Sequence, residues 1–103
     1  LGWMYDNGLH VSKIEVTARK WYRLAAEQGN AFAQTNLGWM YATGRGGVEN
    51  DVYAYMWGNI SASNENEKGG DLRDLIAKRM TPAQIAKAKK LAAECVHKNY
   101  KGC

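Results

Sequence analysis

Apolar residues recur at spacings of three and four over most of the chain, which is the period of an α-helix with one buried face. The pattern is clear in the segment 31–43, whose apolar residues on one face are Ala33, Leu37, Met40 and Tyr41. Asn30 precedes this segment, where an N-cap belongs, and Gly44 follows it, where a glycine commonly ends a helix. We therefore predict a helix over about 31–43.

Helical periodicity extends over three other segments. One covers about 15–28 and is followed by a glycine, and another runs from residue 50 or 51, both of which are good N-caps, to about 62. The stretch 63–70 is polar and contains two adjacent glycines, so we expect it to be a connection. The apolar spacing resumes over 71–80, where we predict a further helix.

The clearest helix start in the chain is Thr81-Pro82-Ala83-Gln84. Threonine suits the N-cap, proline suits the first helical position, and glutamine three residues after the cap completes a capping box. The helix predicted from here to about 99 has one apolar face and a lysine-rich remainder. Because the terminal unit of a helical stack needs one apolar and one polar face, we expect this helix to be a cap.

The chain contains an internal repeat. The motif Leu1-Gly2-Trp3-Met4-Tyr5 recurs as Leu37-Gly38-Trp39-Met40-Tyr41, and with this offset of 36 residues 11 of the 31 positions from 1 to 31 are identical. Self-similarity at such a period indicates stacked helical hairpins that share one core. A glycine inside a helix costs about 1 kcal/mol relative to alanine, so we expect Gly2 and Gly38 to lie where Trp21 or Trp57 of the partner helix approaches closely.

These observations predict an all-α fold, an α-solenoid of antiparallel helix pairs with a C-terminal capping helix. We divide the chain into a partial first repeat at 1–29, a second repeat at 30–64 and a C-terminal helical cap at 65–103. Leu1 already lies inside the repeated motif. We therefore expect the chain to be the C-terminal part of a longer protein.

Charge is unevenly distributed along the chain. The net charge is +4, and residues 68–103 carry nine Lys or Arg against three Asp or Glu, whereas residues 1–67 carry five against seven. A basic last helix can bind an anionic surface weakly, but a solvated face is the commoner role, and we regard nucleic acid as an unlikely partner. No run approaches the roughly 20 apolar residues of a membrane-spanning helix.

The repeated residues resemble the Sel-one-like repeat family, a relative of the tetratricopeptide solenoids. The resemblance depends on Leu37-Gly38-x-Met40-Tyr41-x-x-Gly44, on Trp21-Tyr22-x-x-Ala25-Ala26-Glu27-Gln28-Gly29-Asn30-Ala31-x-Ala33-Gln34 and on Ala54-Tyr55-Met56-Trp57. The end of the chain, Met80-Thr81-Pro82-Ala83-Gln84-Ile85-Ala86, looks like the closing helices of many bacterial members. One departure is the turn from Gly44 to Val48, which is one residue longer than its counterpart from Gly8 to Val11.

The resemblance implies a right-handed superhelix that binds a protein or peptide and needs no cofactor or catalytic residue. The residues agree with a non-enzymatic role, since the sequence has no Gly-x-Ser-x-Gly, Cys-x-x-Cys or phosphate-binding motif. His10 and His97 lie far apart, and no Cys or carboxylate accompanies them at ligand spacing. We therefore predict no metal site.

The aromatic residues fall into two groups. Tyr5, Tyr41, Trp21 and Trp57 occupy positions where the repeat needs bulk, so we expect them in the core. A second stripe on helix 31–43, next to the core stripe, consists of Phe32, Asn36, Trp39 and Thr43. In solenoids of the resembled kind this helix lines the concave side, so these residues, with Trp3, are our candidate partner-binding site. The alternative is that both tryptophans are wedged between successive repeats.

Cys95 and Cys103 are the two cysteines, eight residues apart. Gly102 allows the tail to turn back, so the pair can form a disulfide that fixes the C-terminus to the last helix; the alternative is a half-buried thiol and an exposed one. A bridge would favour an oxidising compartment such as the periplasm or the cell exterior. The compartment is otherwise open.

An alternative function is a structural cap or oligomerisation unit of a longer repeat protein. The first repeat is incomplete, so its leading edge could pair with another chain and form a homo-oligomer. The protein-binding and the oligomerisation hypotheses both stay open at this point.

Overall fold

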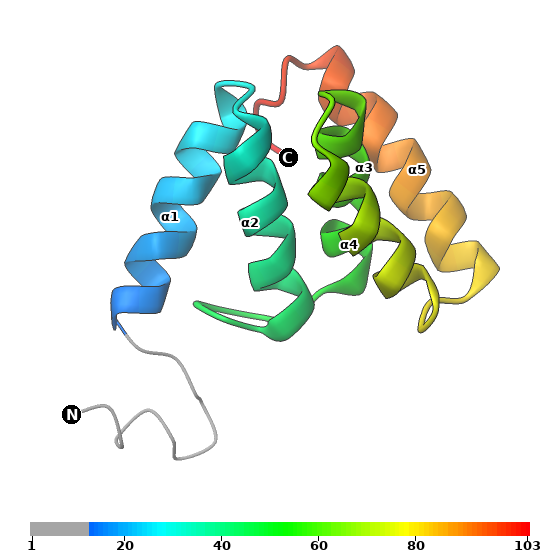
Figure 1. Cartoon of the computed structure of the whole chain (residues 1–103), viewed down its shortest axis with the longest axis horizontal. Helices are drawn as coiled ribbons and strands as arrows, with labels where there is room; N and C mark the ends of the chain where they lie inside the picture. The colour runs from blue at the N-terminus through cyan, green and yellow to red at the C-terminus, as the bar shows by residue number, and fades with distance from the viewer. Residues whose placement is uncertain (1–12) are drawn as a thin grey trace.

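The computed structural model describes residues 13–103. They form five helices, α1 (Lys13–Glu27), α2 (Ala31–Thr43), α3 (Asp51–Ser63), α4 (Glu67–Ala77) and α5 (Pro82–His97). Successive helices run in opposite directions, and the described part of the chain contains no strand (Figure 1). The prediction of an all-α stack of antiparallel helices is confirmed. The predicted helical stub over 1–7 lies outside the described residues.

Short polar side chains fix where the helices begin. The side-chain oxygens of Asn30, Asn50 and Asn66 each accept a hydrogen bond from a backbone N–H in the first turn of α2, α3 and α4. Thr81 caps α5 in the same way, and the Thr81 N–H donates to Gln84 Oε1 at 2.9 Å, which completes the predicted capping box. Such caps satisfy amides that the first turn leaves without an intrahelical partner.

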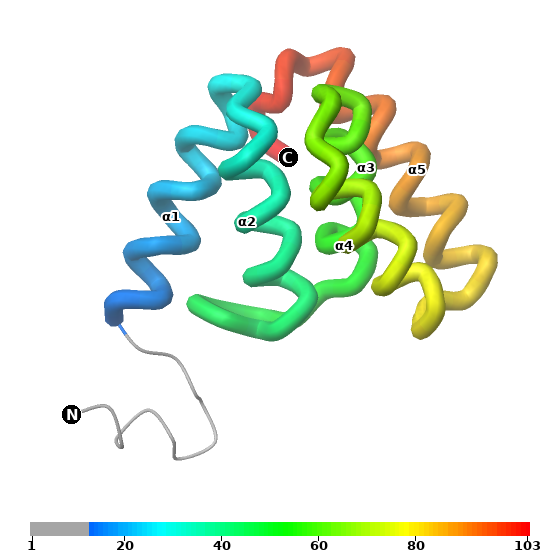
Figure 2. The backbone as a smooth tube through the Cα atoms, viewed as in Figure 1, coloured from blue at the N-terminus to red at the C-terminus, as the bar shows by residue number. Residues whose placement is uncertain are grey.

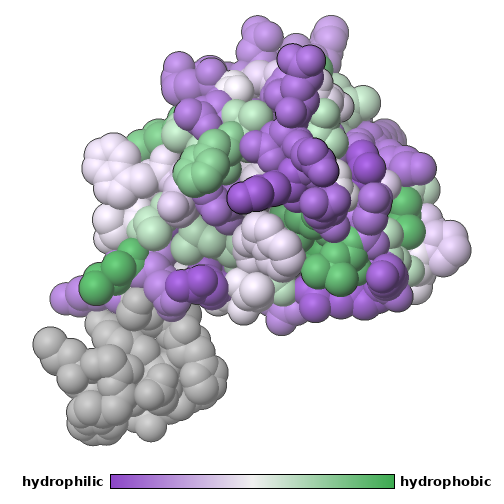
Figure 3. Space-filling model, viewed as in Figure 1, coloured by the Kyte–Doolittle hydropathy of each residue, from purple (hydrophilic) through white to green (hydrophobic). Residues whose placement is uncertain are grey.

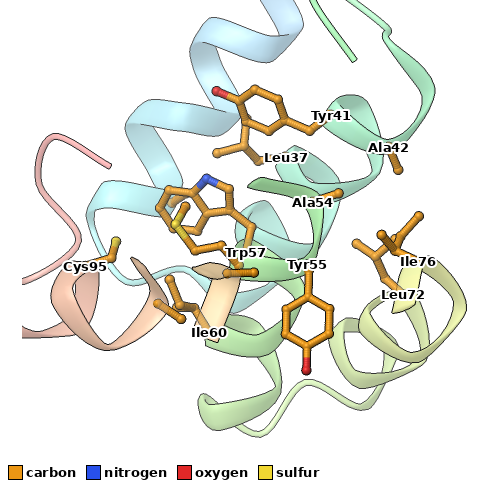
Figure 4. Close-up of a cluster of buried hydrophobic side chains, with 14 of the residues drawn as sticks. Leu37, Tyr41, Ala42, Ala54, Tyr55, Trp57, Ile60, Leu72, Ile76 and Cys95 are labelled. Carbon is orange, nitrogen blue, oxygen red and sulfur yellow. The ribbon is translucent and has the colours of Figure 1, made fainter. Parts of the chain in front are cut away.

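Helix α3 is the centre of the described fold, since α2, α4 and α5 all pack against it. Trp57 in its middle is fully buried, between Leu37 of α2 and Cys95 of α5 in Figure 4. The remaining core comes from all five helices and their turns, and includes Ala26, Tyr41, Ala54, Met56, Ile60, Leu72, Ile76 and Ala88. Tyr41 and Trp57 therefore lie in the core, as the repeat pattern predicts.

Gly38 lies at a close helix contact. A Cβ atom at this position would be 2.7 Å from Leu72 Cδ2, 3.3 Å from the Ala54 carbonyl oxygen and 3.5 Å from Trp57 Cβ. The predicted approach of Trp57 is confirmed, and α4 contributes a further neighbour through Leu72. Gly2, the equivalent glycine of the first repeat, lies outside the described residues.

The start of α4 differs from the prediction. The segment 63–70 was expected to be a connection, but α4 begins at Glu67 and includes both Gly69 and Gly70. Gly69 is needed there because α3 and α4 cross with backbone against backbone. A Cβ at Gly69 would be 2.9 Å from the Gly58 carbonyl oxygen, and a Cβ at Gly58 would be 2.9 Å from that of Gly69.

Trp21 is not in the core, contrary to the prediction. Its side chain is 66% exposed, whereas its counterpart Trp57 is fully buried. The reason is the number of neighbouring helices: among the described residues α1 packs mainly against α2, whereas α3 has α2, α4 and α5 around it. The repeat pattern alone does not distinguish a central helix from one at the edge of the described stack.

Arg79, in the turn after α4, connects three helices. Its guanidinium donates to Asp51 Oδ1 at 2.8 Å, to the Ala42 carbonyl oxygen at 2.7 Å and to Glu49 Oε2 at 3.3 Å. The hydrogen bond to Asp51, helped by the charges of Asp51 and Glu49, raises the pKa of Arg79. The cation thus lies at the C-terminal end of α2, where the helix dipole favours a positive charge. Its partner Asp51 lies at the start of α3, where the helix dipole favours a negative charge.

After α5 the chain turns back across the stack. Helix α5 ends at His97, two residues before the predicted end, and the tail then runs toward the turn between α1 and α2 (Figure 2). A disulfide joins Cys95 of α5 to Cys103, with the two Cα atoms 5.7 Å apart. The C-terminus therefore lies beside the first two described helices, not beyond the last one.

Candidate functional site

A groove of about 420 Å³ lies on the surface between α1 and α2. Its lining comes from both helices and from the loop after α2, and consists of Ile14, Glu15, Ala18, Tyr22, Asn36, Trp39, Met40, Thr43 and Arg45. The apolar part combines two aromatic and three aliphatic side chains, whereas Glu15 and Arg45 supply charge. Such a mixture of apolar surface and a few polar groups is typical of a binding groove.

Hydrogen bonds within α2 fix two of the polar side chains on its side of the groove. Asn36 Nδ2 donates to the Phe32 carbonyl oxygen at 3.2 Å, and Thr43 Oγ1 donates to the Trp39 carbonyl oxygen at 2.8 Å. These bonds turn the two polar side chains toward their own backbone. Trp39, between them on the helix, is 38% exposed and is therefore the large apolar surface that this wall offers.

Arg19 of α1 holds the loop that closes one end of the groove. Its guanidinium donates to the carbonyl oxygens of Met40, Arg45 and Val48 at 2.9, 2.9 and 3.2 Å. It also lies over the Tyr41 ring, 4.4 Å from the ring centroid. Loss of solvent around the partly buried guanidinium lowers the pKa of Arg19, and the nearby Arg23 acts in the same direction. The side chain is thus a structural cation that joins α1 to the end of α2 and to the loop after it.

The longer turn after α2 allows this contact with α1. Gly46 has a φ of +77°, and a Cβ there would be 2.4 Å from the Glu15 carbonyl oxygen, so only glycine fits. The side chains of Arg45 and Glu15 form an ion pair at 3.0 Å. The extra residue noted in the sequence therefore brings the loop against the neighbouring repeat.

The structure brings together three of the five candidate partner-binding residues. Asn36, Trp39 and Thr43 line the groove, whereas Phe32 does not. Phe32 is 67% exposed and lies about two turns earlier on α2, beside the turn between α3 and α4. Trp3 lies outside the described residues.

The sequence pattern does not identify the α1 side of the groove. Ile14, Ala18 and Tyr22 follow a spacing of four, which in the sequence is indistinguishable from a core stripe. Their exposure depends on which helices surround α1, and periodicity carries no information about that. The observation that α1 and α2 belong to successive repeats was the available signal that a groove could form between them.

A second hollow is lined in part by Phe32. Its other lining residues come from the α3–α4 turn and the start of α4, and are Glu65, Asn66, Glu67, Lys68 and Asp71. The hollow is thus an exposed aromatic ring among mostly acidic groups. Figure 3, which shows the face seen in Figure 1, likewise has small apolar patches separated by hydrophilic side chains.

The lysines of the last helix face solvent. Lys87, Lys89 and Lys90 are exposed on α5, and Glu94 lies among them. Within residues 13–103, no three His, Cys, Asp or Glu side chains gather as a metal site would require, and none of the five helices has the length and hydropathy of a membrane span. His97 is exposed on α5, and His10 lies outside the described residues.

Comparison with known proteins finds repeats of one kind. The family model of the Sel1 repeat matches the chain twice, over residues 1–30 and 31–66. A sel1-like repeat-containing protein, L21 of Acanthamoeba polyphaga mimivirus, is 46% identical over 41 residues, which cover 40% of this chain. The matched segment spans only 8% of the length of that relative.

Proposed function

Because this chain belongs to the Sel1 repeat family, whose repeats generally mediate protein–protein interactions, we propose that it binds a segment of another protein in the groove between α1 and α2. The observation that carries the proposal is Trp39, a large aromatic side chain left 38% exposed in the wall of a groove that two successive repeats form together. Tryptophan is among the residues that most often dominate binding energy at interfaces.

The lining favours an apolar side chain as the anchor of the bound segment. Ile14, Ala18 and Met40 can bury it, and the indole of Trp39 adds a flat face for packing. Glu15 and Arg45 are paired with each other at one end, so they mark a polar rim. The expected ligand is therefore a short segment with an apolar anchor and polar flanks.

The experiment is a selection of peptides from a random display library on the intact chain, followed by titration of the selected peptides against variants. Trp39→Ala should weaken binding by about 2 kcal/mol, or roughly thirtyfold. Phe32→Ala is the matched control, because it removes an exposed aromatic ring from the same helix outside the groove. Equal affinity of the Trp39→Ala variant and the unaltered chain for every selected peptide would exclude this groove.

Self-association is a second candidate function, and a specific observation favours it. Helix α1 also exposes large apolar side chains that do not line the groove, with Trp21 66% and Leu24 45% exposed. Contiguous exposed apolar side chains often mark protein contacts. Trp21→Ala should then lower the association seen in sedimentation at increasing protein concentration, whereas a monomer at all concentrations contradicts this function.

A further inference from the structure

The last five residues, 99–103, connect the two ends of the described stack. Lys101 Nζ donates to the Glu27 carbonyl oxygen at the end of α1, at 2.9 Å. The Tyr100 ring lies against Gly29 in the α1–α2 turn, with its Cε2 atom 3.4 Å from the position of a Cβ there. Since α5 packs mainly against α3, and α1 mainly against α2, this segment is a direct link between α5 and the end of α1.

A chain of amide hydrogen bonds extends the contact into the core. Tyr100 OH donates to Asn64 Oδ1 at 3.4 Å, Asn64 Nδ2 donates to Gln34 Oε1 at 3.0 Å, and Gln34 Nε2 donates to the Ala26 carbonyl oxygen at 3.1 Å. Gln34 is fully buried. The tail therefore contacts the α1–α2 turn both directly and through half-buried Asn64 and fully buried Gln34.

The backbone of this segment is held in a conformation that it would not keep alone. Asn99 and Tyr100 have φ values of 56° and 67°, in the left-handed region, which asparagine adopts readily and a bulky residue such as tyrosine rarely does. Tyr100 therefore needs contacts with its surroundings to keep this conformation. The restraint on the far side of this turn is the disulfide, since Cys103 ends the segment and is joined to Cys95.

We propose that residues 99–103 are a redox-controlled clasp, in which the Cys95–Cys103 disulfide holds Tyr100 and Lys101 against the α1–α2 turn and its reduction releases that turn. Cys95 is buried and Cys103 is half-buried, so a dithiol reductant attacks Cys103. A thiolate of the reductant forms a mixed disulfide with the Cys103 sulfur. The bond between Cys103 and Cys95 breaks, and Cys95 leaves as the thiolate.

The second thiol of the reductant then closes a ring and frees Cys103. Two electrons reach the protein, its two sulfurs take up protons, and the reductant leaves as a cyclic disulfide. The left-handed turn at 99–100 relaxes once the bridge no longer holds it. The contacts of the clasp to Gly29, Glu27 and Asn64 are lost with it. The close contact of α3 with α4 at Gly58 and Gly69 involves no residue of 99–103, so the packing of these two helices should be unchanged.

The test is hydrogen exchange of the full chain, followed by mass spectrometry, before and after treatment with a small dithiol. In the oxidised protein the N–H groups of Gly29 and Asn30 bond to the Ala26 and Ala25 carbonyl oxygens, so they exchange slowly. Reduction should raise exchange over residues 24–34 severalfold and leave exchange in α3 and α4 within experimental error. The intact mass should rise by the mass of two hydrogen atoms on reduction.

Variants separate the bridge from the contacts that it holds. Cys103→Ser should exchange like the reduced protein and should not respond to the dithiol. Tyr100→Ala combined with Lys101→Ala keeps the bridge but removes the contacts, so it should exchange rapidly over 24–34 in both redox states. Lys98→Ala, an exposed change at the end of α5, is the matched control and should behave like the unaltered chain.

Three results would overturn the clasp. Free thiols in protein prepared under air would remove its basis. Unchanged exchange over 24–34 after complete reduction would show that the bridge does not control the turn. A rise in exchange across all five helices would instead make the bridge a staple of the whole fold.

Discussion

Arg19 Nη2 on α1 donates a hydrogen bond of 2.9 Å to the carbonyl oxygen of Met40, in the last turn of α2. The same oxygen accepts bonds from the backbone N–H groups of Gly44 and Arg45. A cation at the C-terminal end of a helix also interacts favourably with the helix dipole. This one side chain therefore connects two successive repeats where α2 ends.

Replacing Arg19 by alanine should destabilise the fold by about 2 kcal/mol, because hydrogen bonds from a charged donor to three carbonyl groups are lost. Lys20→Ala, at an exposed position of the same helix, should stay within about 0.5 kcal/mol of the unaltered chain. Urea denaturation followed by circular dichroism measures both. Equal midpoints for the two variants would contradict a structural role for Arg19.

The adjacent glycines of α4 should respond in opposite ways to alanine. A Cβ at Gly69 would be 2.6 Å from Ser61 Cβ and 2.9 Å from the Gly58 carbonyl oxygen, so Gly69→Ala must separate α3 from α4 and should cost about 1–3 kcal/mol. A Cβ at Gly70 would meet nothing closer than 3.5 Å, so Gly70→Ala should be neutral or stabilising by up to about 1 kcal/mol. Thermal unfolding of the Gly69→Ala and Gly70→Ala variants tests this prediction. A Gly69→Ala variant that is the more stable of the two would contradict the close contact of α3 and α4 at Gly69.

Gln34 should tolerate no apolar replacement of similar size. Gln34→Met removes the hydrogen bonds to the Ala26 carbonyl oxygen and from the Asn64 amide, and the loss of the two bonds should cost about 1–3 kcal/mol in total. Gln28→Met makes the same exchange at an exposed position and should be nearly neutral. Chemical denaturation compares the two variants, and a Gln34→Met variant as stable as the unaltered chain would show that the amide chain adds nothing.

The helices could be predicted largely because their signals are local. Asn30 and Gly44 delimit α2, and Thr81 with Pro82 starts α5, at the positions that the sequence indicates. The start of α4 was missed because Gly69 and Gly70 are typical of a connection when only neighbours in sequence are considered. The identity of Asn66 with the cap Asn30, 36 residues earlier, was the signal that a helix begins there.

The candidate site could be predicted only in part, for a geometric reason. Phe32 and Trp39 share a helix face, but they are seven residues apart, or about 10 Å along the axis. Over that distance the neighbours of α2 change: Phe32 meets the α3–α4 turn, and Trp39 meets α1. Helical periodicity predicts on which face of a helix a residue lies, but not which neighbouring element packs against that face. For the same reason, periodicity does not predict that Trp21 is exposed.

The crossing of Gly58 and Gly69 has a consequence for how the end of the stack varies between related sequences. Because backbone meets backbone there, the closest point of contact between α3 and α4 is made by two residues without side chains. The outward residues of α4 and α5 can then change charge or size without moving this contact. Evolution, or a designer, can give this terminus a new surface while the repeats before it keep their geometry.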